Sequence, residues 1–198
     1  DFIAHLQSMG RAGPAGKKYE YVSANTNVLG LVIENVTASS YAEAVAALIW
    51  SRIGAEADAL VSVNAKGYAY ASGGLSARLR DVARFGQIFT ESAGFPVLGK
   101  AQLTAMAAEG ITLKTDAWTK DPSSGHSDPA VRAAWQWDAI WEDGGMYKNG
   151  YLGQGLYVDP ARELVVAWFG TGLNFSEQMN ELKEVTRQLV RAGVFAVP

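Results

Sequence analysis

Side chains of the three types found in hydrolytic triads crowd together in one short stretch of this chain. His126 lies in the segment Ser123–Pro129, beside Ser127 and Asp128. Members of a triad converge from separate elements of a fold, so adjacency along the chain does not build one. We interpret residues 123–129 as a solvated polar loop. The nucleophile signature Gly-x-Ser-x-Gly does not occur, and the two histidines do not form a zinc-binding pattern.

A polar cluster led by a tyrosine precedes an apolar stretch with helical spacing. It reads Tyr21-Val22-Ser23-Ala24-Asn25-Thr26-Asn27-Val28-Leu29-Gly30. Serine and asparagine favour the N-cap position of a helix, so these residues by themselves favour a helix start with no chemical role.

Two further segments change that interpretation. Residues 73–86 read Gly-Gly-Leu-Ser-Ala-Arg-Leu-Arg-Asp-Val-Ala-Arg-Phe-Gly, and residues 148–160 read Lys-Asn-Gly-Tyr-Leu-Gly-Gln-Gly-Leu-Tyr-Val-Asp-Pro. With the tyrosine cluster, these motifs in this order resemble the serine β-lactamase and penicillin-binding-protein superfamily. Within it, the chain is most similar to the carboxylesterase and 6-aminohexanoate-dimer hydrolase group. The resemblance covers nearly the whole chain and implies an α+β, β-lactamase-like fold, of which this is the C-terminal portion.

The resemblance implies roles for the first motif. Tyr21 matches the tyrosine that takes a proton from the serine nucleophile and passes it to the leaving group. A phenol ordinarily titrates at about pH 10, so this role needs a nearby cation, which in the family is the lysine of Ser-x-x-Lys. Ser23 takes the place of the asparagine in the family's Tyr-x-Asn motif, and is expected to bind substrate.

The resemblance also implies a pocket-lining strand at Lys148-Asn149-Gly150. These residues match the Lys-Thr-Gly motif, and Lys148 there hints at a carboxylate or other anion in the substrate. Gly150 would let the substrate approach the backbone. The backbone N–H of Tyr151 falls where the family places one donor of its oxyanion hole.

The family's nucleophile motif is missing from these residues. No serine is followed three residues later by lysine, and the nearest approach is Ser8 with Arg11, whose guanidinium cannot act as a base. We therefore expect the nucleophile on an N-terminal segment of the same enzyme, and no catalysis by this polypeptide without that partner.

Tryptophans gather in the stretch from Trp118 to Trp141, which contains four of the six in the chain. Most of them are expected to pack in strands and core. Trp118 lies among polar residues, so it can instead line the substrate entrance.

Hydrophobic periodicity predicts the elements that position these motifs. Helices are expected at 1–9 and 25–36, after a capping box at Ser40-x-x-Glu43, and after a cap at Ser76. A last helix is expected at 177–191, with Met179, Leu182, Val185 and Leu189 as its apolar stripe. A half-buried strand is expected at 135–141, a second at 155–159, and a third, covered on both faces, at 164–169. They predict an antiparallel meander with the last helix packed on it. We expect a mainly helical part, 1–130, and a part with sheet strands and terminal helix, 131–198, in one catalytic domain.

Composition excludes several classes of protein. Apolar residues make up 48% and charged residues 19% of the chain, as in a globular protein. The net charge of −3 comes without a basic stripe, so a nucleic-acid partner is not expected. No stretch is apolar enough for a transmembrane segment. Without cysteine there is no disulfide or thiolate zinc site, which suits cytoplasm and periplasm alike. No cofactor is expected.

The expected function is hydrolysis of a small-molecule ester or amide through an acyl-enzyme. The alternative is a catalytically inactive relative that binds peptides or acyl compounds. An intact Ser-x-x-Lys upstream would favour the enzyme.

Overall fold

The computed structural model describes residues 2–11, 13–17, 19–93, 97–108, 111–112, 132–171 and 177–195. Its α-helices are α1 (Phe2–Ser8), α2 (Ser23–Thr37), α3 (Tyr41–Leu48), α4 (Leu79–Gln87), α5 (Lys100–Ala108) and α6 (Glu177–Arg191). Its strands are β1 (Leu60–Val61), β2 (Leu75–Ser76), β3 (Ile111–Thr112), β4 (Arg132–Ala134), β5 (Trp137–Ile140), β6 (Met146–Asn149), β7 (Gly155–Asp159) and β8 (Leu164–Trp168). Short 3₁₀ helices occupy η1 (Trp50–Arg52) and η3 (Pro160–Arg162).

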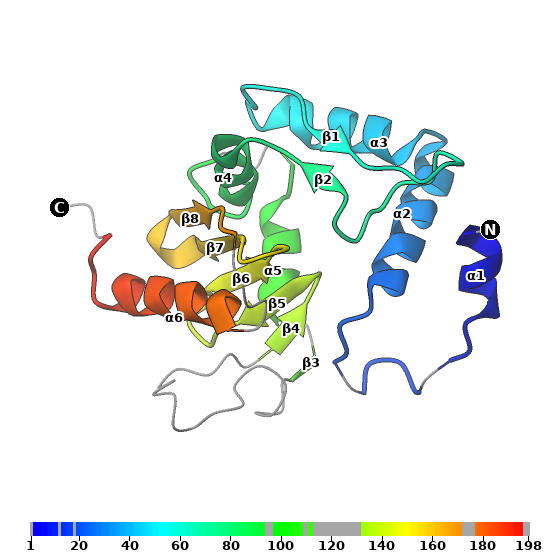
Figure 1. Ribbon diagram of the computed structural model, residues 1–198. Helices are drawn as coiled ribbons and strands as arrows, with labels where there is room; N and C mark the ends of the chain where they lie inside the picture. Colours follow the sequence, from blue (N-terminus) through cyan, green and yellow to red (C-terminus); the bar gives the residue numbers. More distant parts are fainter. Residues whose placement is uncertain are drawn as a thin grey trace.

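The described strands form an antiparallel meander, as the sequence predicts. The larger sheet has six strands in the order β3-β4-β5-β6-β7-β8, and β1 pairs with β2 in a separate small sheet. Figure 1 shows α2 and α3 to one side of the larger sheet, with α1 beyond them. The periodicity predicts only three strands. Of the strands in the larger sheet it misses β3, β4 and β6. The side chains Met146, Tyr147 and Lys148 of β6 are apolar, aromatic and charged and show no alternation.

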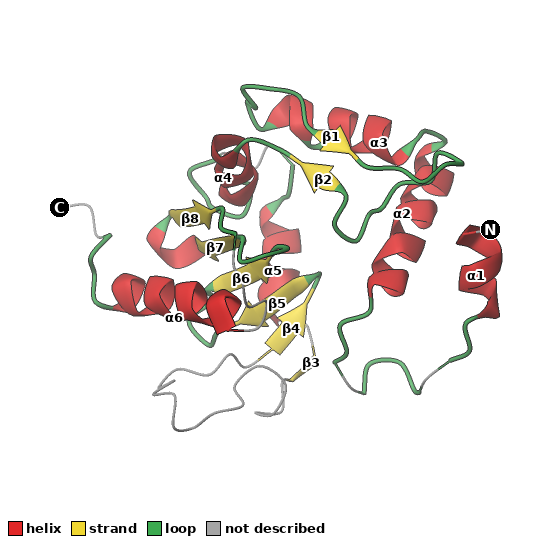
Figure 2. Ribbon diagram, in the orientation of Figure 1, coloured by secondary structure: helices red, strands yellow, loops and turns green. Residues whose placement is uncertain are grey.

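Helices cover both faces of the larger sheet (Figure 2). On one face, residues at the end of α4 and Met106 of α5 pack against the strands in one core cluster: Ile88, Phe89, Met106, Trp137, Ile140, Met146, Leu156 and Val158. On the other face, Val190 of α6 packs with Ala139, Trp141, Tyr147 and Tyr157. β8 contributes to both clusters, so the prediction of a strand covered on two sides is confirmed. The end of α4 therefore covers the face of the sheet that α6 leaves open. A Cβ on Gly86 would lie 2.5 Å from Val165 Cγ1, so the glycine allows this close approach.

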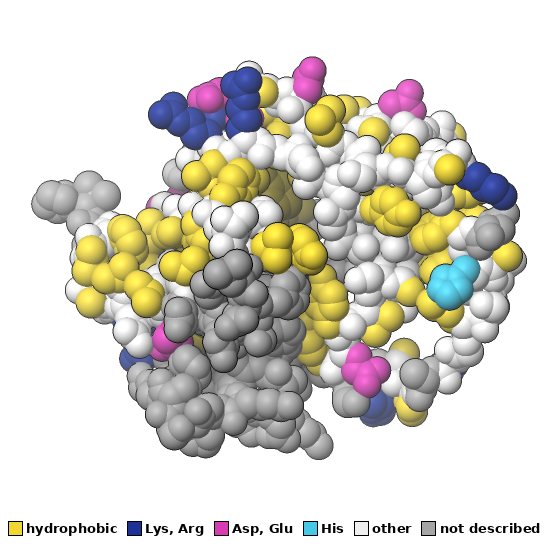
Figure 3. All heavy atoms as spheres, viewed as in Figure 1, with side chains coloured by type: hydrophobic (Ala, Val, Ile, Leu, Met, Phe, Trp, Pro, Cys, Tyr) yellow, Lys and Arg dark blue, Asp and Glu magenta, His cyan; other side chains and the backbone are white. Residues whose placement is uncertain are grey.

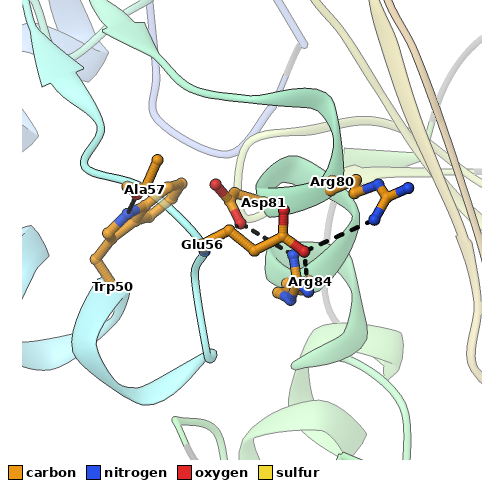
Figure 4. Close-up of polar contacts among 6 residues, drawn as sticks. All are labelled: Trp50, Glu56, Ala57, Arg80, Asp81 and Arg84. Carbon is orange, nitrogen blue, oxygen red and sulfur yellow. Dashed lines mark hydrogen bonds and ion pairs between the residues drawn. The ribbon is translucent and has the colours of Figure 1, made fainter.

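An ion-pair network fastens the loop after η1 to α4 (Figure 4). Asp81 is fully buried, and its Oδ1 accepts hydrogen bonds from Glu56 N at 2.8 Å and Arg84 Nη1 at 3.1 Å. Arg84 Nη2 lies 2.6 Å from Glu56 Oε1. Trp50 Nε1 donates to Ala57 O at 2.8 Å. Residues 80–84, which read Arg-Asp-Val-Ala-Arg, therefore have a structural role. Asp81 and Arg84 of this motif bind Glu56 and so connect the loop after η1 to the helix that covers the sheet.

Of the two helix starts predicted from capping residues, one is found in the structure and the other is not. Ser40 and Glu43 form the predicted capping box at the start of α3. The prediction for Ser76 is wrong: it lies in β2, and Arg78 is the N-cap of α4 without a side-chain hydrogen bond. Ser76 pairs with Leu60 of β1 and lies two residues before Arg78, so it does not occupy the N-cap position of α4. No helix within the described ranges is long and apolar enough to span a membrane.

The predicted strand at 135–141 begins later than expected. Trp135 and Gln136 have φ values of 52° and 68° and form the tight turn between β4 and β5. A two-residue hairpin of this hand requires positive φ at both positions, and here no glycine marks it in the sequence. β5 is also buried along its whole length, so the predicted half-buried pattern is wrong. Its polar residue Asp138 can be buried because both oxygens of its carboxylate accept hydrogen bonds.

The face of α6 that packs on the sheet is not the predicted one. Leu182, Val185 and Leu189 are 37–49% exposed, whereas Lys183, Thr186, Arg187 and Val190 are buried. Arg187 reaches the sheet through an ion pair and a hydrogen bond, which compensate for its burial. Hydrophobic periodicity selects the most apolar stripe, and that stripe faces outward here.

Candidate active site

Tyr21 and Lys148 lie side by side although 126 residues separate them in the sequence. Tyr21 is in the segment that leads into α2, and its side chain is 54% exposed. Lys148 is in β6, and its Nζ lies 5.1 Å from the centre of the Tyr21 ring. This is within the range of a cation–π contact. The fold therefore brings the first and third sequence motifs together.

A pocket of about 220 Å³ opens between the Tyr21 segment and the β4–β5 hairpin. Its described lining consists of residues 19–22, Asn25, Thr26 and residues 133–138. Thr26 Oγ1 donates to Gln136 Oε1 at 2.8 Å, which holds the start of α2 against the hairpin turn. The Tyr21 segment thus forms one wall of a cleft whose opposite wall is the β4–β5 hairpin.

The tyrosine cluster does not act as a helix cap. The N-cap of α2 is Val22 in extended conformation, and no side chain caps the helix. Asn27 is buried and accepts a hydrogen bond from Ser72 N at 3.0 Å, so it has a structural role. Ser23 and Asn25 are exposed at the first turn. The purely structural interpretation accounts for Asn27 and Thr26 but not for Tyr21, Ser23 or Asn25.

Asp138 is a buried residue of this site that sequence reasoning missed. It is 5% exposed and accepts hydrogen bonds from Lys148 Nζ at 2.8 and 2.9 Å and from Asn149 N at 2.9 Å. Tyr19 Oη donates to the same carboxylate at 3.3 Å. The signal available in the sequence was an acidic residue on a strand that precedes a lysine-bearing strand. Opposite charges on paired strands commonly interact, but the pairing register was not known.

The two tyrosines of the segment have different surroundings. Burial, together with the charge and hydrogen bond of Asp138 and the neighbouring Tyr21, raises the pKa of Tyr19 well above its ordinary value. Tyr19 therefore keeps its proton and serves as a donor to Asp138. Tyr21 faces the pocket beside a lysine, which makes it the better placed of the two to exchange protons with a substrate.

The turn after β6 contains the remaining predicted residues. Gly150 N donates to Gln154 O at 2.8 Å and closes the turn that leads into β7. Leu152 and Gly153 have positive φ, and Tyr151 is 71% exposed. Asn149 and Gly150 follow Lys148 directly, but among the described residues the pocket lining includes none of residues 148–151, nor Ser23. Their roles in substrate or oxyanion binding stay predictions.

Other predicted residues lie outside the described part of the chain. Trp118 and the polar loop containing His126 fall in this category. Within the described residues, no group of three or more His, Cys, Asp and Glu side chains could hold a metal ion.

Known proteins are similar to this chain in sequence and in fold. A 6-aminohexanoate-dimer hydrolase of Paenarthrobacter ureafaciens is 29% identical over 178 residues, which are 84% of this chain and 41% of the relative. A Bacillus anthracis protein, provisionally designated a 6-aminohexanoate-dimer hydrolase, matches with a TM-score of 0.78 and 25% identity over 100% of this chain and 50% of that one. A penicillin-binding protein of Bacillus halodurans has the same fold: TM-score 0.64, 16% identity, 93% of this chain and 62% of the other.

The chain spans 41% of the Paenarthrobacter ureafaciens relative and 50% of the Bacillus anthracis protein. The sequence model of the β-lactamase family matches residues 1–191. The α+β fold predicted from the motifs is therefore confirmed, and the chain belongs to the β-lactamase family.

Proposed function

We propose that this chain is part of a serine hydrolase that cleaves a small-molecule ester or amide through an acyl-enzyme. The observation that carries the proposal is the position of Tyr21, exposed at a pocket with Lys148 Nζ 5.1 Å from its ring. The named hydrolases among its relatives support the same reaction class. Tyr21 would take the proton of the nucleophile and return it to the leaving group.

The nucleophile would come from a segment of the same protein outside these residues. The 198 residues contain no Ser-x-x-Lys. Residues 1–198 would then belong to a single catalytic domain that the segment completes. Ser23, Asn149, Gly150 and the backbone N–H of Tyr151 are proposed to bind the substrate around the tyrosine.

Trapping of the acyl-enzyme tests the reaction class. In the intact protein that contains this chain, a slowly deacylating ester or a fluorophosphonate is expected to add its acyl or phosphonyl mass to one serine. Peptide mapping of the modified protein would locate that serine outside residues 1–198. A protein that binds such compounds reversibly and never becomes modified would instead be the inactive binding relative. Modification of a serine within residues 1–198 would contradict the proposed division of the site.

Uncovered apolar surface supports the need for another segment. On α2, the stripe Val28, Leu29, Val32, Ile33 and Val36 is 38–79% exposed. The outer stripe of α6 is also exposed, and Figure 3 shows hydrophobic side chains along the part of the surface that α6 occupies. In the described sheet order, β8 pairs with a neighbour on one edge only. Apolar surfaces of this extent usually mark contacts with another protein segment.

We therefore expect the 198-residue chain to be poorly stable without its covering segment. Leaving several hundred Å² of apolar surface exposed costs about 25 cal/mol per Å², comparable with the stability of an ordinary domain. Expressed by itself, it should associate or bind a hydrophobic dye, and sedimentation should show oligomers. Co-expression with the upstream segment should yield a dye-free complex. A cooperative monomer of 21.2 kDa from this chain by itself would contradict the expectation.

A further inference from the structure

Asp138 lines the pocket and is held in an ion pair with Lys148. Lys148 Nζ donates to both oxygens of its carboxylate, at 2.8 and 2.9 Å. The remaining donors are Asn149 N at 2.9 Å and Tyr19 Oη at 3.3 Å. The side chain of Asp138 is 6% exposed and that of Lys148 is 32% exposed. The carboxylate is thus almost entirely removed from water, and both of its oxygens are occupied.

The register of the sheet produces this pair. β5 and β6 are antiparallel, with Ala139 opposite Tyr147 and Ile140 opposite Met146. Continuing this register by one residue places Asp138 opposite Lys148 on the same face of the sheet. The ion pair is therefore built into the strand pairing and does not depend on a mobile loop. Its lysine end meets the ring of Tyr21.

The pair leaves no uncompensated positive charge for a substrate anion. Lys148 can bind a carboxylate only by giving up its contacts to Asp138 or by sharing them. A shared arrangement would place two carboxylates beside each other in a partly dry site, which is unfavourable. Asp138 lines the pocket and is already paired with Lys148, so this pair presents no net positive charge to an anionic ligand.

We infer that Asp138 sets the charge specificity of this site by holding Lys148 in a closed ion pair under Tyr21, so that the site selects uncharged acyl groups over those bearing a carboxylate. Asp138 acts through Lys148 and is a positioning residue. The inference rests on the proposed hydrolase function. It reverses the expectation that Lys148 itself recognises a substrate anion.

A pair of matched esters tests the inference in the intact protein. 4-Nitrophenyl hexanoate is neutral, and mono-4-nitrophenyl adipate carries a carboxylate on a chain of the same length. The wild type should prefer the neutral ester. In Asp138→Asn, the ratio of kcat/KM for adipate over hexanoate should rise on the order of tenfold to a hundredfold, the usual effect of one hydrogen bond to a charged group. We expect the change mainly in KM.

Two further variants separate charge selection from a structural effect. Lys148→Met leaves Asp138 without its cation, so the adipate-to-hexanoate ratio should fall below that of the wild type. Asp159→Asn is the matched control, because Asp159 is a fully buried carboxylate paired with Arg162 at 2.6 Å at the far end of β7. It can lower stability but should leave the ratio unchanged.

Binding gives a readout that does not require hydrolysis. Hexanoate and hexanamide are titrated against each variant, with the fluorescence of Trp135 and Trp137 in the pocket wall as the signal. Asp138→Asn should bind hexanoate more tightly relative to hexanamide than the wild type does. The same relative affinity in both proteins, or a wild type that already prefers hexanoate, would overturn the inference. Absence of ester hydrolysis in the wild type would instead count against the proposed function.

Discussion

Replacement of Tyr21 by phenylalanine is expected to lower kcat of the intact enzyme by about 10²–10⁴-fold, the usual contribution of one proton-transfer group. The substitution removes only the phenolic oxygen. Because the side chain is 54% exposed, the free energy of unfolding should change by less than about 0.5 kcal/mol. Tyr19 cannot take over the role, since burial and the Asp138 carboxylate raise its pKa and keep it protonated.

Steady-state kinetics on a neutral ester, with urea unfolding of the same preparations, would measure both effects. Tyr70→Phe is the matched control, because Tyr70 is 44% exposed and lies outside the described pocket lining. It should retain full turnover. Near-normal turnover in Tyr21→Phe would show that another group carries the proton, whereas equal losses in both variants would indicate a nonspecific effect.

Replacement of Arg187 by methionine is expected to destabilise the protein by about 2–4 kcal/mol, as is usual when one partner of a buried ion pair is removed. Arg187 is 3% exposed, and its Nη1 lies 2.9 Å from Asp143 Oδ2 and 3.0 Å from Tyr157 Oη. Its guanidinium carbon lies 4.9 Å from the centre of a Trp141 ring. Burial raises the pKa of Tyr157 to about 12, so its phenol stays neutral and accepts the hydrogen bond.

The loss should depend on pH in a defined direction. Burial by itself would raise the pKa of Asp143. Hydrogen bonds from Arg187 and Gly145 N, with the charges of Arg187 and Arg162, outweigh burial and lower it. A carboxyl with a lowered folded-state pKa stabilises the fold above its unfolded value of about 4, and that contribution disappears as the pH falls through the folded value. The deficit of Arg187→Met should therefore be largest near neutral pH and shrink in acid.

Urea unfolding of the intact protein at several pH values measures this deficit. Gln188→Ala, on the exposed side of the same helix, is the matched control and should change stability by less than about 0.5 kcal/mol. A deficit in Arg187→Met no larger than in the control would mean that α6 is held by its apolar contacts. A deficit that stays constant into acid would show that Asp143 is not its main partner.

Several features of the fold and site follow from local sequence. The Ser40–Glu43 capping box, the span of α6 and the strand at 155–159 depend on neighbouring residues, and the sequence predicts them correctly. The motif resemblance also leads to the β-lactamase family and selects Tyr21 and Lys148 as residues of interest. These predictions succeed because capping, periodicity and short motifs depend on the order of nearby residues.

Only the tertiary structure decides which residues meet. The pairing of Asp138 with Lys148 depends on the β5–β6 register, and the residue pattern of β6 did not identify it as a strand. The face of α6 that packs inward depends on partners for Arg187 that come from the sheet. In both cases a charged residue is buried against the trend of its hydropathy because a distant partner compensates its charge. Hydrophobic patterns record the average preference of a residue for water, and they contain no information about a partner elsewhere in the chain.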